Sequence, residues 1–308
     1  MAPVNPTKFI WMNGKLVKWE DAKIHVLTHA LHYGSGVFEG IRCYKTPKGP
    51  AVFRLKDHIQ RLVKSAEAYK MKLPYSAEEM CKAVKDTVRE NKIDACYIRP
   101  ILYNGYGEMG LNPTNCKVDF AVAVWEWGTY LGEEGLEKGV RVKVSSWSRF
   151  DQRSMPTAAK ACGNYLNSIL AKLEAIECGV DECILLNTNG SVAEGPGENV
   201  FAVYHGKLLT PPGSAGILYG ITRNSIMHVA RDMGMEVIER DMNRNDLYLA
   251  DELFFTGTAA EVSPIREVDG RKIGIGKRGP VTEKLQKKFF EIAAGKDLKY
   301  EKWLDYVK

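Results

Sequence analysis

One lysine of the sequence stands among small apolar residues, where a cation is unfavourable. Lys160 lies in the stretch Thr157-Ala-Ala-Lys160-Ala-Cys-Gly163, directly before a segment with helical periodicity that we expect to form a buried helix. Burial disfavours an ammonium ion and lowers the pKa of a lysine, so that its neutral amine becomes available as a nucleophile or Schiff-base partner. A surface lysine on a turn is the simpler interpretation of this stretch, and Lys160 alone does not decide between the two.

Three further stretches carry complementary chemistry. The turn from Glu194 to Asn199 places a carboxylate at the end of a strand. The stretch Gly220-Ile-Thr-Arg223 opens a helix, and a helix N-terminus favours phosphate. The small-residue turn Gly257-Thr-Ala-Ala260 also offers backbone amides to an anion. Each stretch alone is commonplace. With Lys160 they match the needs of pyridoxal phosphate (PLP), which has an aldehyde, a ring nitrogen that takes an acidic partner, and a phosphate.

Two other patterns predict no cofactor. His25, His29 and His32 have the spacing of one helix face, but no acidic residue or cysteine flanks them to complete a metal site. The stretch Gly105-Tyr-Gly-Glu-Met-Gly110 matches a dinucleotide-binding fingerprint, yet the following Leu-Asn-Pro113 does not begin the required helix. We expect structural histidines, a loop at 105–110, and neither a metal nor a nicotinamide cofactor.

Composition and charge exclude several classes of protein. The 308 residues are 45% hydrophobic and 26% charged, as in an ordinary globular protein of one or two domains. The net charge of +5 comes from scattered residues, with no basic run longer than Lys287-Lys288, which gives no support to nucleic-acid binding. Apolar runs such as 120–125 are too short to span a bilayer, and the first residues lack the apolar core of a signal peptide. No cysteine pair among the seven has C-x-x-C spacing, so we expect reduced thiols and a cytoplasmic location.

Local patterns predict an α+β chain in two domains. Four glycines in the segment 128–139 indicate a linker. We therefore expect a small α+β domain over residues 1–128, an interdomain loop over 129–138, and a large α/β domain over 139–308. The predicted helices are 55–71, one beginning after Ser76 with a capping box to Glu79, 164–178, 222–233 and 281–293. The predicted strands are 8–12 and 15–17 around an Asn-Gly turn, 95–103, 118–125, one from 140, 182–187, 200–204, 207–210 and 252–256.

Along nearly its whole length the chain resembles the branched-chain-amino-acid aminotransferases, members of the fold-type IV PLP enzymes. The ordered motifs that carry this resemblance are Trp11-Met-Asn-Gly14, His29-Ala-Leu-His-Tyr-Gly34, Val37-Phe-Glu-Gly-Ile-Arg42, Tyr97-Ile-Arg-Pro100, 159–165, 194–201, 220–223 and 257–261. The chain departs from many relatives at Pro196, where they carry a small residue, and the stretch 107–109 varies among them.

The resemblance implies a two-domain, D-amino-acid aminotransferase-like architecture with PLP at the domain interface. Lys160 would form the Schiff base with PLP and move a proton, and Glu194 would pair with the ring nitrogen. The other cofactor-binding residues that it implies are Tyr165 at the ring's phenolic oxygen and Arg61, Ile221, Thr222 and Thr258 at the phosphate.

The resemblance also implies the substrates. The reaction would be a ping-pong transfer of the amino group of L-leucine, L-isoleucine or L-valine to 2-oxoglutarate, giving the branched-chain 2-oxo acid and L-glutamate. Tyr97 and the backbone of Thr258 and Ala259 would hold the substrate carboxylate, and Arg99 the distal carboxylate of glutamate. The side-chain pocket would consist of Tyr33, Phe38, Met109, Trp127 and Tyr130. Members of the family are at least dimers and some are hexamers, so a homo-oligomer is expected.

Alternatives remain at this point. A D-amino-acid aminotransferase or an aminodeoxychorismate lyase would share Lys160 and Glu194. The segment Tyr97-Ile-Arg99 and the aromatic residues up to Tyr130 favour the branched-chain enzyme. A non-catalytic binding protein would not need a Schiff-base lysine together with a partner for the ring nitrogen.

Overall fold

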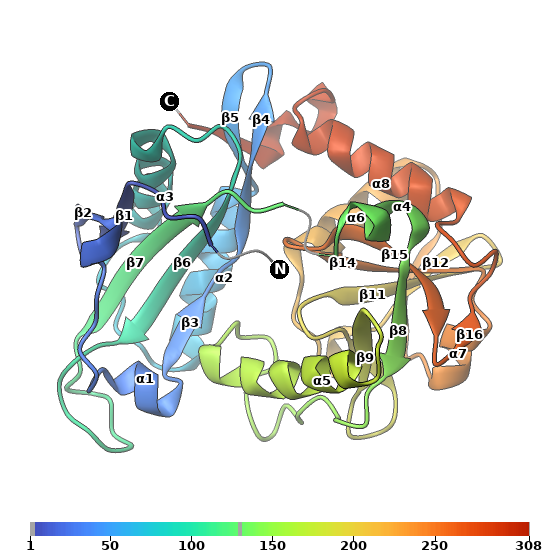
Figure 1. Ribbon diagram of the computed structural model, residues 1–308, viewed down its shortest axis with the longest axis horizontal. Helices are drawn as coiled ribbons and strands as arrows, with labels where there is room; N and C mark the ends of the chain where they lie inside the picture. Colours follow the sequence, from blue (N-terminus) through green and yellow to red (C-terminus); the bar gives the residue numbers. More distant parts are fainter. Residues whose placement is uncertain (1–3, 129–130, 308) are drawn as a thin grey trace. The chain divides into compact units, whose positions relative to one another are not determined.

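The computed structural model describes residues 4–128 and 131–307 and divides the chain into two compact units (Figure 1). The first unit comprises Met1–Trp127, Ala159–Gly163 and Ile292–Lys308, and the second comprises Gly128–Ala158 and Asn164–Glu291. The C-terminal segment belongs to the first unit because its strand, Leu304–Tyr306, pairs with Gly49–Phe53. The expected domain of residues 139–308 thus contributes two segments to the first unit.

The first unit is an antiparallel sheet packed against two helices. Among the described residues its sheet has eight strands in the order β17-β5-β4-β6-β7-β1-β2, with β3 paired to β6. The strands are β1 Phe9–Met12, β2 Lys15–Lys18, β3 Gly36–Phe38, β4 Ile41–Thr46, β5 Gly49–Phe53, β6 Cys96–Asn104, β7 Val118–Trp125 and β17 Leu304–Tyr306, and the helices are α1 His29–Tyr33, α2 Leu55–Ala68 and α3 Ala77–Asn91. The apolar faces of α2 and α3 and the sheet share one core.

Local sequence signals account for these elements. The apolar spacing of α2 places Ile59 and Leu62 in the core, and both are fully buried. The predicted capping box is confirmed, because the Ser76 side chain accepts from the Glu79 amide while the Glu79 carboxylate accepts from the Ser76 amide. The predicted hairpin around Asn13 is likewise confirmed by the antiparallel pairing of β1 and β2.

The second unit has a mixed sheet. Its described residues form nine strands in the order β10-β9-β8-β15-β14-β11-β12-β13, with β16 paired to β15. The strands are β8 Val140–Val144, β9 Glu182–Leu186, β10 Val192–Glu194, β11 Asn199–Tyr204, β12 Lys207–Thr210, β13 Val237–Glu239, β14 Glu252–Gly257, β15 Glu261–Val268 and β16 Arg271–Lys272, and the helices are α4 Glu133–Lys138, α5 Tyr165–Glu177, α6 Ile221–Asp232, α7 Arg244–Tyr248 and α8 Pro280–Ala293. Helix α5 contacts β9, and α6 contacts β14. The fold is α+β, as predicted.

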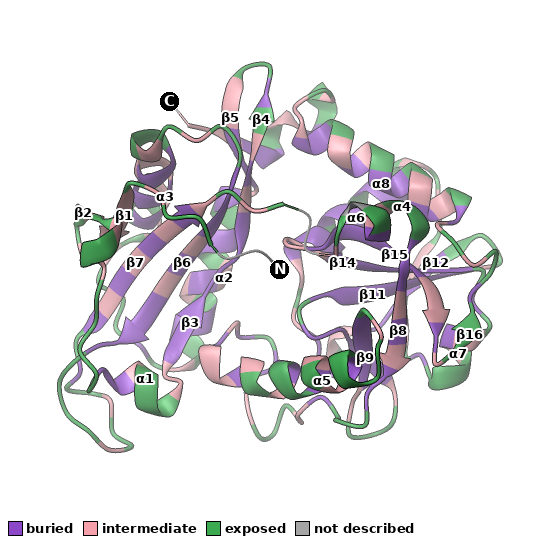
Figure 2. Cartoon of the chain, in the orientation of Figure 1, coloured by how far each residue is buried: buried purple, intermediate pink, exposed green. Residues whose placement is uncertain are grey.

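Two expectations about this part of the chain are wrong. The glycine-rich segment expected to be a loop contains the short helix α4. The helix after Lys160 was expected to be buried, but α5 is largely exposed (Figure 2). It buries small side chains, Ser168, Ala171 and Ala175, against the unit and turns an apolar stripe outward. The stripe consists of Leu166, Ile169, Leu170, Leu173 and Ile176, which are 42–67% exposed.

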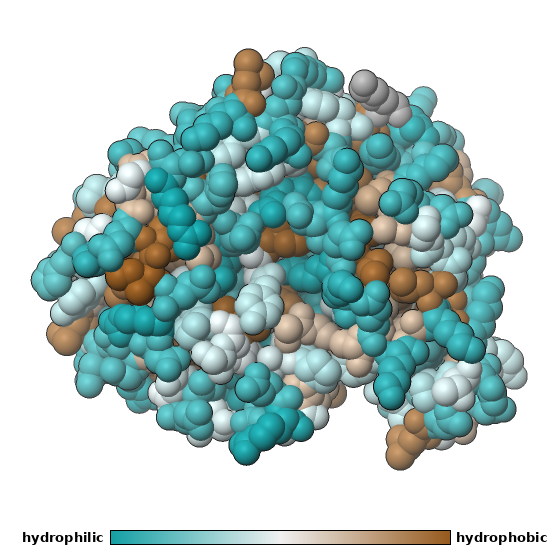
Figure 3. Space-filling model, turned by 180° about the vertical axis from the view of Figure 1, so that it is seen from behind, coloured by the Kyte–Doolittle hydropathy of each residue, from teal (hydrophilic) through white to brown (hydrophobic). Residues whose placement is uncertain are grey.

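One face of the molecule is mostly polar (Figure 3). On the face drawn in Figure 3, hydrophilic side chains predominate and apolar ones form small separate groups. Within the described residues, no helix is both long enough and apolar enough to cross a membrane.

Candidate active site

Lys160 belongs to a five-residue segment that returns to the first unit. Ala161 forms a bridge with Val37, and the Lys160 carbonyl accepts from the Phe38 amide at 3.0 Å. The Lys160 amide donates to the Ser65 hydroxyl on α2 at 2.9 Å. Hydrogen bonds to both a strand and a helix therefore hold the backbone of this lysine in place. A side chain that reacts with a ligand needs such a fixed backbone.

The amine of Lys160 is buried, which decides between the two interpretations of this stretch against a surface lysine on a turn. Part of the residue is exposed, but the amine itself is surrounded by protein atoms, with Nζ 5.1 Å from the ring centroid of Phe38. Burial and the nearby charge of Arg61 lower the pKa of Lys160 to about 8, although Glu39 opposes the shift. A substantial fraction of the amine is therefore neutral near pH 7 to 8, which suits a nucleophile and a proton acceptor.

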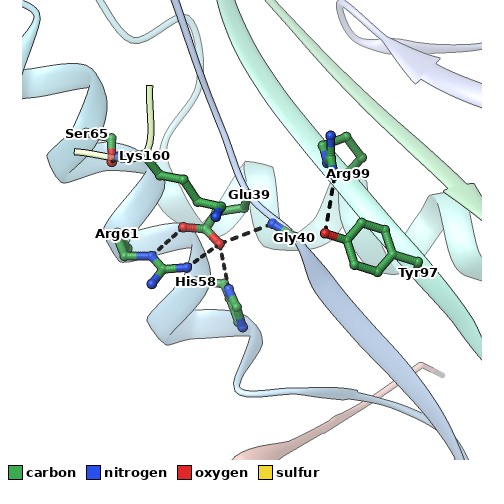
Figure 4. A network of polar contacts seen from close by, with 8 residues as sticks. All are labelled: Glu39, Gly40, His58, Arg61, Ser65, Tyr97, Arg99 and Lys160. Atoms are coloured by element: carbon green, nitrogen blue, oxygen red, sulfur yellow. Dashed lines mark hydrogen bonds and ion pairs between the residues drawn. The ribbon is translucent and has the colours of Figure 1, made fainter. Parts of the chain in front are cut away.

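Arg61 projects from α2 into a polar network beside this amine (Figure 4). Its guanidinium donates to both carboxylate oxygens of Glu39, from Nε at 2.6 Å and from Nη2 at 2.8 Å. The His58 ring bonds the same carboxylate through Nδ1 at 2.7 Å. The predicted phosphate ligand is thus held in place by a buried carboxylate.

Arg99 and several rings gather in the same unit. The Arg99 guanidinium carbon lies 4.7 Å from the ring centroid of Phe38 and 5.3 Å from that of Tyr97. Its Nη2 donates to the Tyr97 hydroxyl at 3.2 Å, whereas its Nε is buried and has no hydrogen-bond partner among the described residues. Trp127 packs edge-on against Tyr97, with centroids 4.5 Å apart. The rings can contact an apolar side chain, and the guanidinium among them can pair with a carboxylate.

Two further residues predicted for the pocket lie on a short helix and in a loop of this unit. Tyr33 ends α1 and Met109 lies in the loop before β7, and both are exposed. The loop is tied to α1 through buried His29, whose Nε2 bonds the Gly110 carbonyl at 2.7 Å. This histidine is structural, as predicted. Tyr130 lies outside the described residues.

Glu194 lies at the end of β10 in the second unit, as the sequence predicts, and is buried. Arg149 approaches one carboxylate oxygen at 3.0 Å. The other oxygen accepts from the Asn199 side chain at 3.1 Å and from the Leu218 amide at 2.9 Å. Three donors favour an ionised carboxylate, the form that can keep a ring nitrogen protonated.

The predicted phosphate ligands of the second unit lie at element ends. Ile221 and Thr222 are buried in the first turn of α6, with Gly220 at the N-cap. A Cβ on Gly220 would overlap the Asn199 side-chain oxygen, so the close approach requires glycine. Thr258 and Ala259 form the turn between β14 and β15, and Tyr165 begins α5.

Four residues of these networks escaped the sequence reasoning. Glu39, His58 and Arg149 are buried, charged or titratable, and Asn199 is buried beside Glu194. The signal for Glu39 was a carboxylate between two apolar strands, and a buried carboxylate needs a partner. Nothing local identified Arg149, because its partner is distant in the chain.

These residues fit PLP in kind. The first unit supplies a buried amine of lowered pKa, an oriented guanidinium and a buried, unpaired Nε on Arg99. The second unit supplies a carboxylate paired with Arg149 and a twelve-residue helix whose N-terminus suits a phosphate. Aldehyde, ring nitrogen and phosphate each have a matching group.

The chain belongs to the amino-transferase class IV family, whose model matches residues 36–268. It is 50% identical to the branched-chain-amino-acid aminotransferase of Pseudomonas aeruginosa over 299 residues, 97% of each chain. The crystal structure of the branched-chain amino acid aminotransferase of Escherichia coli superposes with a TM-score of 0.96 at 48% identity, covering 98% of this chain and 100% of that one. The branched-chain amino acid aminotransferase of Thermobaculum terrenum in its PLP form superposes with a TM-score of 0.93 at 36% identity, covering 98% of this chain and 99% of that one.

Proposed function

We infer that the protein is a PLP-dependent transaminase for branched-chain amino acids. It transfers the amino group of L-leucine, L-isoleucine or L-valine to 2-oxoglutarate, giving the branched-chain 2-oxo acid and L-glutamate. The observation that carries this function is the Lys160 amine, surrounded by protein beside Arg61 with its pKa lowered to about 8. The relatives named for this activity match the chain over almost its full length.

The proposed chemistry assigns one task to each group near the amine. When bound, PLP supplies an aldehyde that condenses with amines and a protonated ring that withdraws electrons from the substrate Cα. Lys160 would hold the cofactor through its neutral amine and would accept and return the proton at the substrate Cα. Its lowered pKa makes this base available near neutral pH.

The other cofactor residues have separate tasks. Glu194, held ionised by Arg149 and Asn199, keeps the ring nitrogen protonated. Tyr165 would donate to the phenolic oxygen of the bound cofactor. The phosphate is bound by Arg61, Ile221, Thr222 and Thr258.

Dual substrate specificity follows from an arginine among rings. The side-chain pocket is formed by Tyr33, Phe38, Met109, Trp127 and Tyr130. Arg99 takes the distal carboxylate of glutamate through the guanidinium that lies over Phe38. Tyr97 and the backbone of Thr258 and Ala259 hold the α-carboxylate.

The test is formation of L-glutamate from L-leucine and 2-oxoglutarate. The PLP-loaded protein should catalyse it, and Lys160→Ala should abolish it. Lys64→Ala is the matched control, because Lys64 is an exposed lysine of α2 paired only with Glu67 in the described contacts. Full activity of Lys160→Ala would refute the assignment.

Assembly and location complete the proposal. The outward apolar stripe of α5 supports a homo-oligomer, a dimer or a hexamer, because monomers rarely expose so contiguous an apolar surface. Ile169→Asp should lower the mass measured by light scattering, and an unchanged mass would exclude this stripe from the interface. All seven cysteines are free, which supports a reducing compartment such as the cytoplasm.

A further inference from the structure

Glu39 is a buried carboxylate that takes no part in the proposed chemistry. It lies between β3 and β4, where its amide donates to the Pro100 carbonyl at 2.9 Å, and its side chain is fully buried. Arg61 meets it as a fork, with one guanidinium nitrogen on each oxygen. Such bidentate pairs fix the plane of a guanidinium as well as its position.

His58 completes the arrangement one turn before Arg61 on α2. Burial, the larger influence, lowers the pKa of His58 and outweighs the opposing charge of Glu39, so the ring is neutral at pH 7. An ionised carboxylate only accepts, so Nδ1 carries the hydrogen and donates to Glu39. The carboxylate is ionised: burial would raise its pKa, but Arg61 and His58 together hold the pKa of Glu39 well below its usual range.

We propose that Glu39 is a positioning residue for the cofactor phosphate, acting through Arg61, and that His58 in turn fixes the Glu39 carboxylate. This rests on the proposed function, in which Arg61 binds the phosphate. Figure 4 shows the side chains of Arg61 and Lys160 extending toward the same carboxylate from α2 and from the returning segment. An arginine already held in its fork loses less conformational entropy on binding phosphate than a free one does.

A simpler role for Glu39 predicts the opposite result. If the carboxylate only neutralised Arg61, its removal would leave a more positive site, and the phosphate would bind more tightly. If it only stabilised the fold, its removal would weaken all ligands alike. Positioning predicts weaker binding that is confined to the ligand with a phosphate.

The experiment compares PLP with pyridoxal, which keeps the aldehyde and ring but lacks the phosphate. Dissociation constants for apoprotein variants would come from titration of the visible absorption band. Glu39→Gln preserves length but presents an amide N–H to one guanidinium nitrogen. This variant should lower the affinity for PLP about 10- to 100-fold, which is the range for losing a charge-assisted pair. Its affinity for pyridoxal should stay within about twofold of that of the parent. Glu67→Gln, at an exposed pair on the same helix, is the control and should change neither.

A double-mutant cycle separates this inference from the function on which it rests. Arg61→Ala should remove most of the preference for PLP over pyridoxal, and Glu39→Gln should then add nothing. If Arg61→Ala leaves the preference intact, Arg61 is not the phosphate ligand. The positioning role of Glu39 is wrong if Arg61→Ala removes the preference for PLP but Glu39→Gln does not reduce it. It is also wrong if Glu39→Gln lowers the affinity for both ligands equally or raises the affinity for PLP.

His58 provides a second route should Glu39→Gln fail to fold. His58→Asn keeps an N–H donor near the place of Nδ1, whereas His58→Leu removes it. His58→Leu should lower the affinity for PLP about 10-fold and change the affinity for pyridoxal little. His58→Asn should keep most of the PLP affinity of the parent. Equal PLP affinity in the two variants would overturn the role given to His58.

Discussion

Replacing Lys160 by methionine should stabilise the apoprotein at neutral pH. Methionine has a similar length and no charge, so it removes the ammonium that the surroundings of Lys160 disfavour. The same substitution removes the amine that we propose holds the cofactor. Function and stability are therefore in conflict at this residue.

The magnitude follows from the pKa of Lys160, which falls from 10.5 to about 8 on folding. Because the folded-state pKa lies below the unfolded one, the unfolded chain binds more protons between these values, and stability rises with pH there. At pH 7 both states are protonated, and the folded ammonium costs up to about 3 kcal/mol. At pH 9.5 the folded lysine is already neutral, and the cost falls to about 1.4 kcal/mol.

Urea unfolding of both apoproteins at pH 7 and pH 9.5 provides the assay. The variant should be more stable at pH 7, and its advantage should shrink by about half at pH 9.5, because other titrating groups contribute equally to both proteins. Lys64→Met, at an exposed lysine, should change stability by less than about 0.5 kcal/mol at either pH. A destabilised Lys160→Met, or an advantage independent of pH, would refute the reasoning.

Three further predictions concern other parts of the site. Arg99→Ala should slow the half-reaction with L-glutamate about 100-fold or more and that with L-leucine less than about 10-fold, measured in single turnovers; equal losses would remove its role as carboxylate partner. Gly220→Ala should destabilise the protein by about 1–3 kcal/mol, because the new Cβ displaces Asn199, and an unchanged melting temperature would contradict this. Burial and the neighbouring Glu182 raise the pKa of Glu198 to about 8 from 4.5, so its contribution to stability is full below pH 4.5 and is lost as pH rises through 8. Glu198→Gln should therefore gain stability over the parent between pH 5 and pH 9 in urea unfolding, and a constant difference would argue against the raised pKa.

Local signals predicted most of the elements that position the site. The helix expected over 55–71 is α2 Leu55–Ala68, and the one expected over 222–233 is α6 Ile221–Asp232. The carboxylate at a strand end and the glycine before a helix, Glu194 and Gly220, also lie where the sequence placed them. These helices and element ends depend on residues that are close in the sequence, so periodicity and capping rules can predict them.

Contacts between distant residues were not predictable in this way. Glu39 and Arg61 form an ion pair because β3 packs against α2. Arg149 forms an ion pair with Glu194, which is 45 residues further along the chain. The apolar periodicity of α5 was correct, but the face it defines points outward, and a single sequence does not reveal what covers an apolar face. The lowered pKa of Lys160 was predictable only in part. Its small neighbours in the sequence indicate burial, but residues distant in the sequence, such as Arg61, also contribute to the shift.

The most direct test of the central claim is the visible spectrum of the PLP-loaded protein before and after addition of L-leucine, with D-alanine added to a parallel sample. We predict that the cofactor band collapses with L-leucine and not with D-alanine, as the amino group moves to the cofactor. A band that responds only to D-alanine would contradict the branched-chain function while leaving the cofactor in place. If no band forms after PLP is added, the role assigned to Lys160 is wrong.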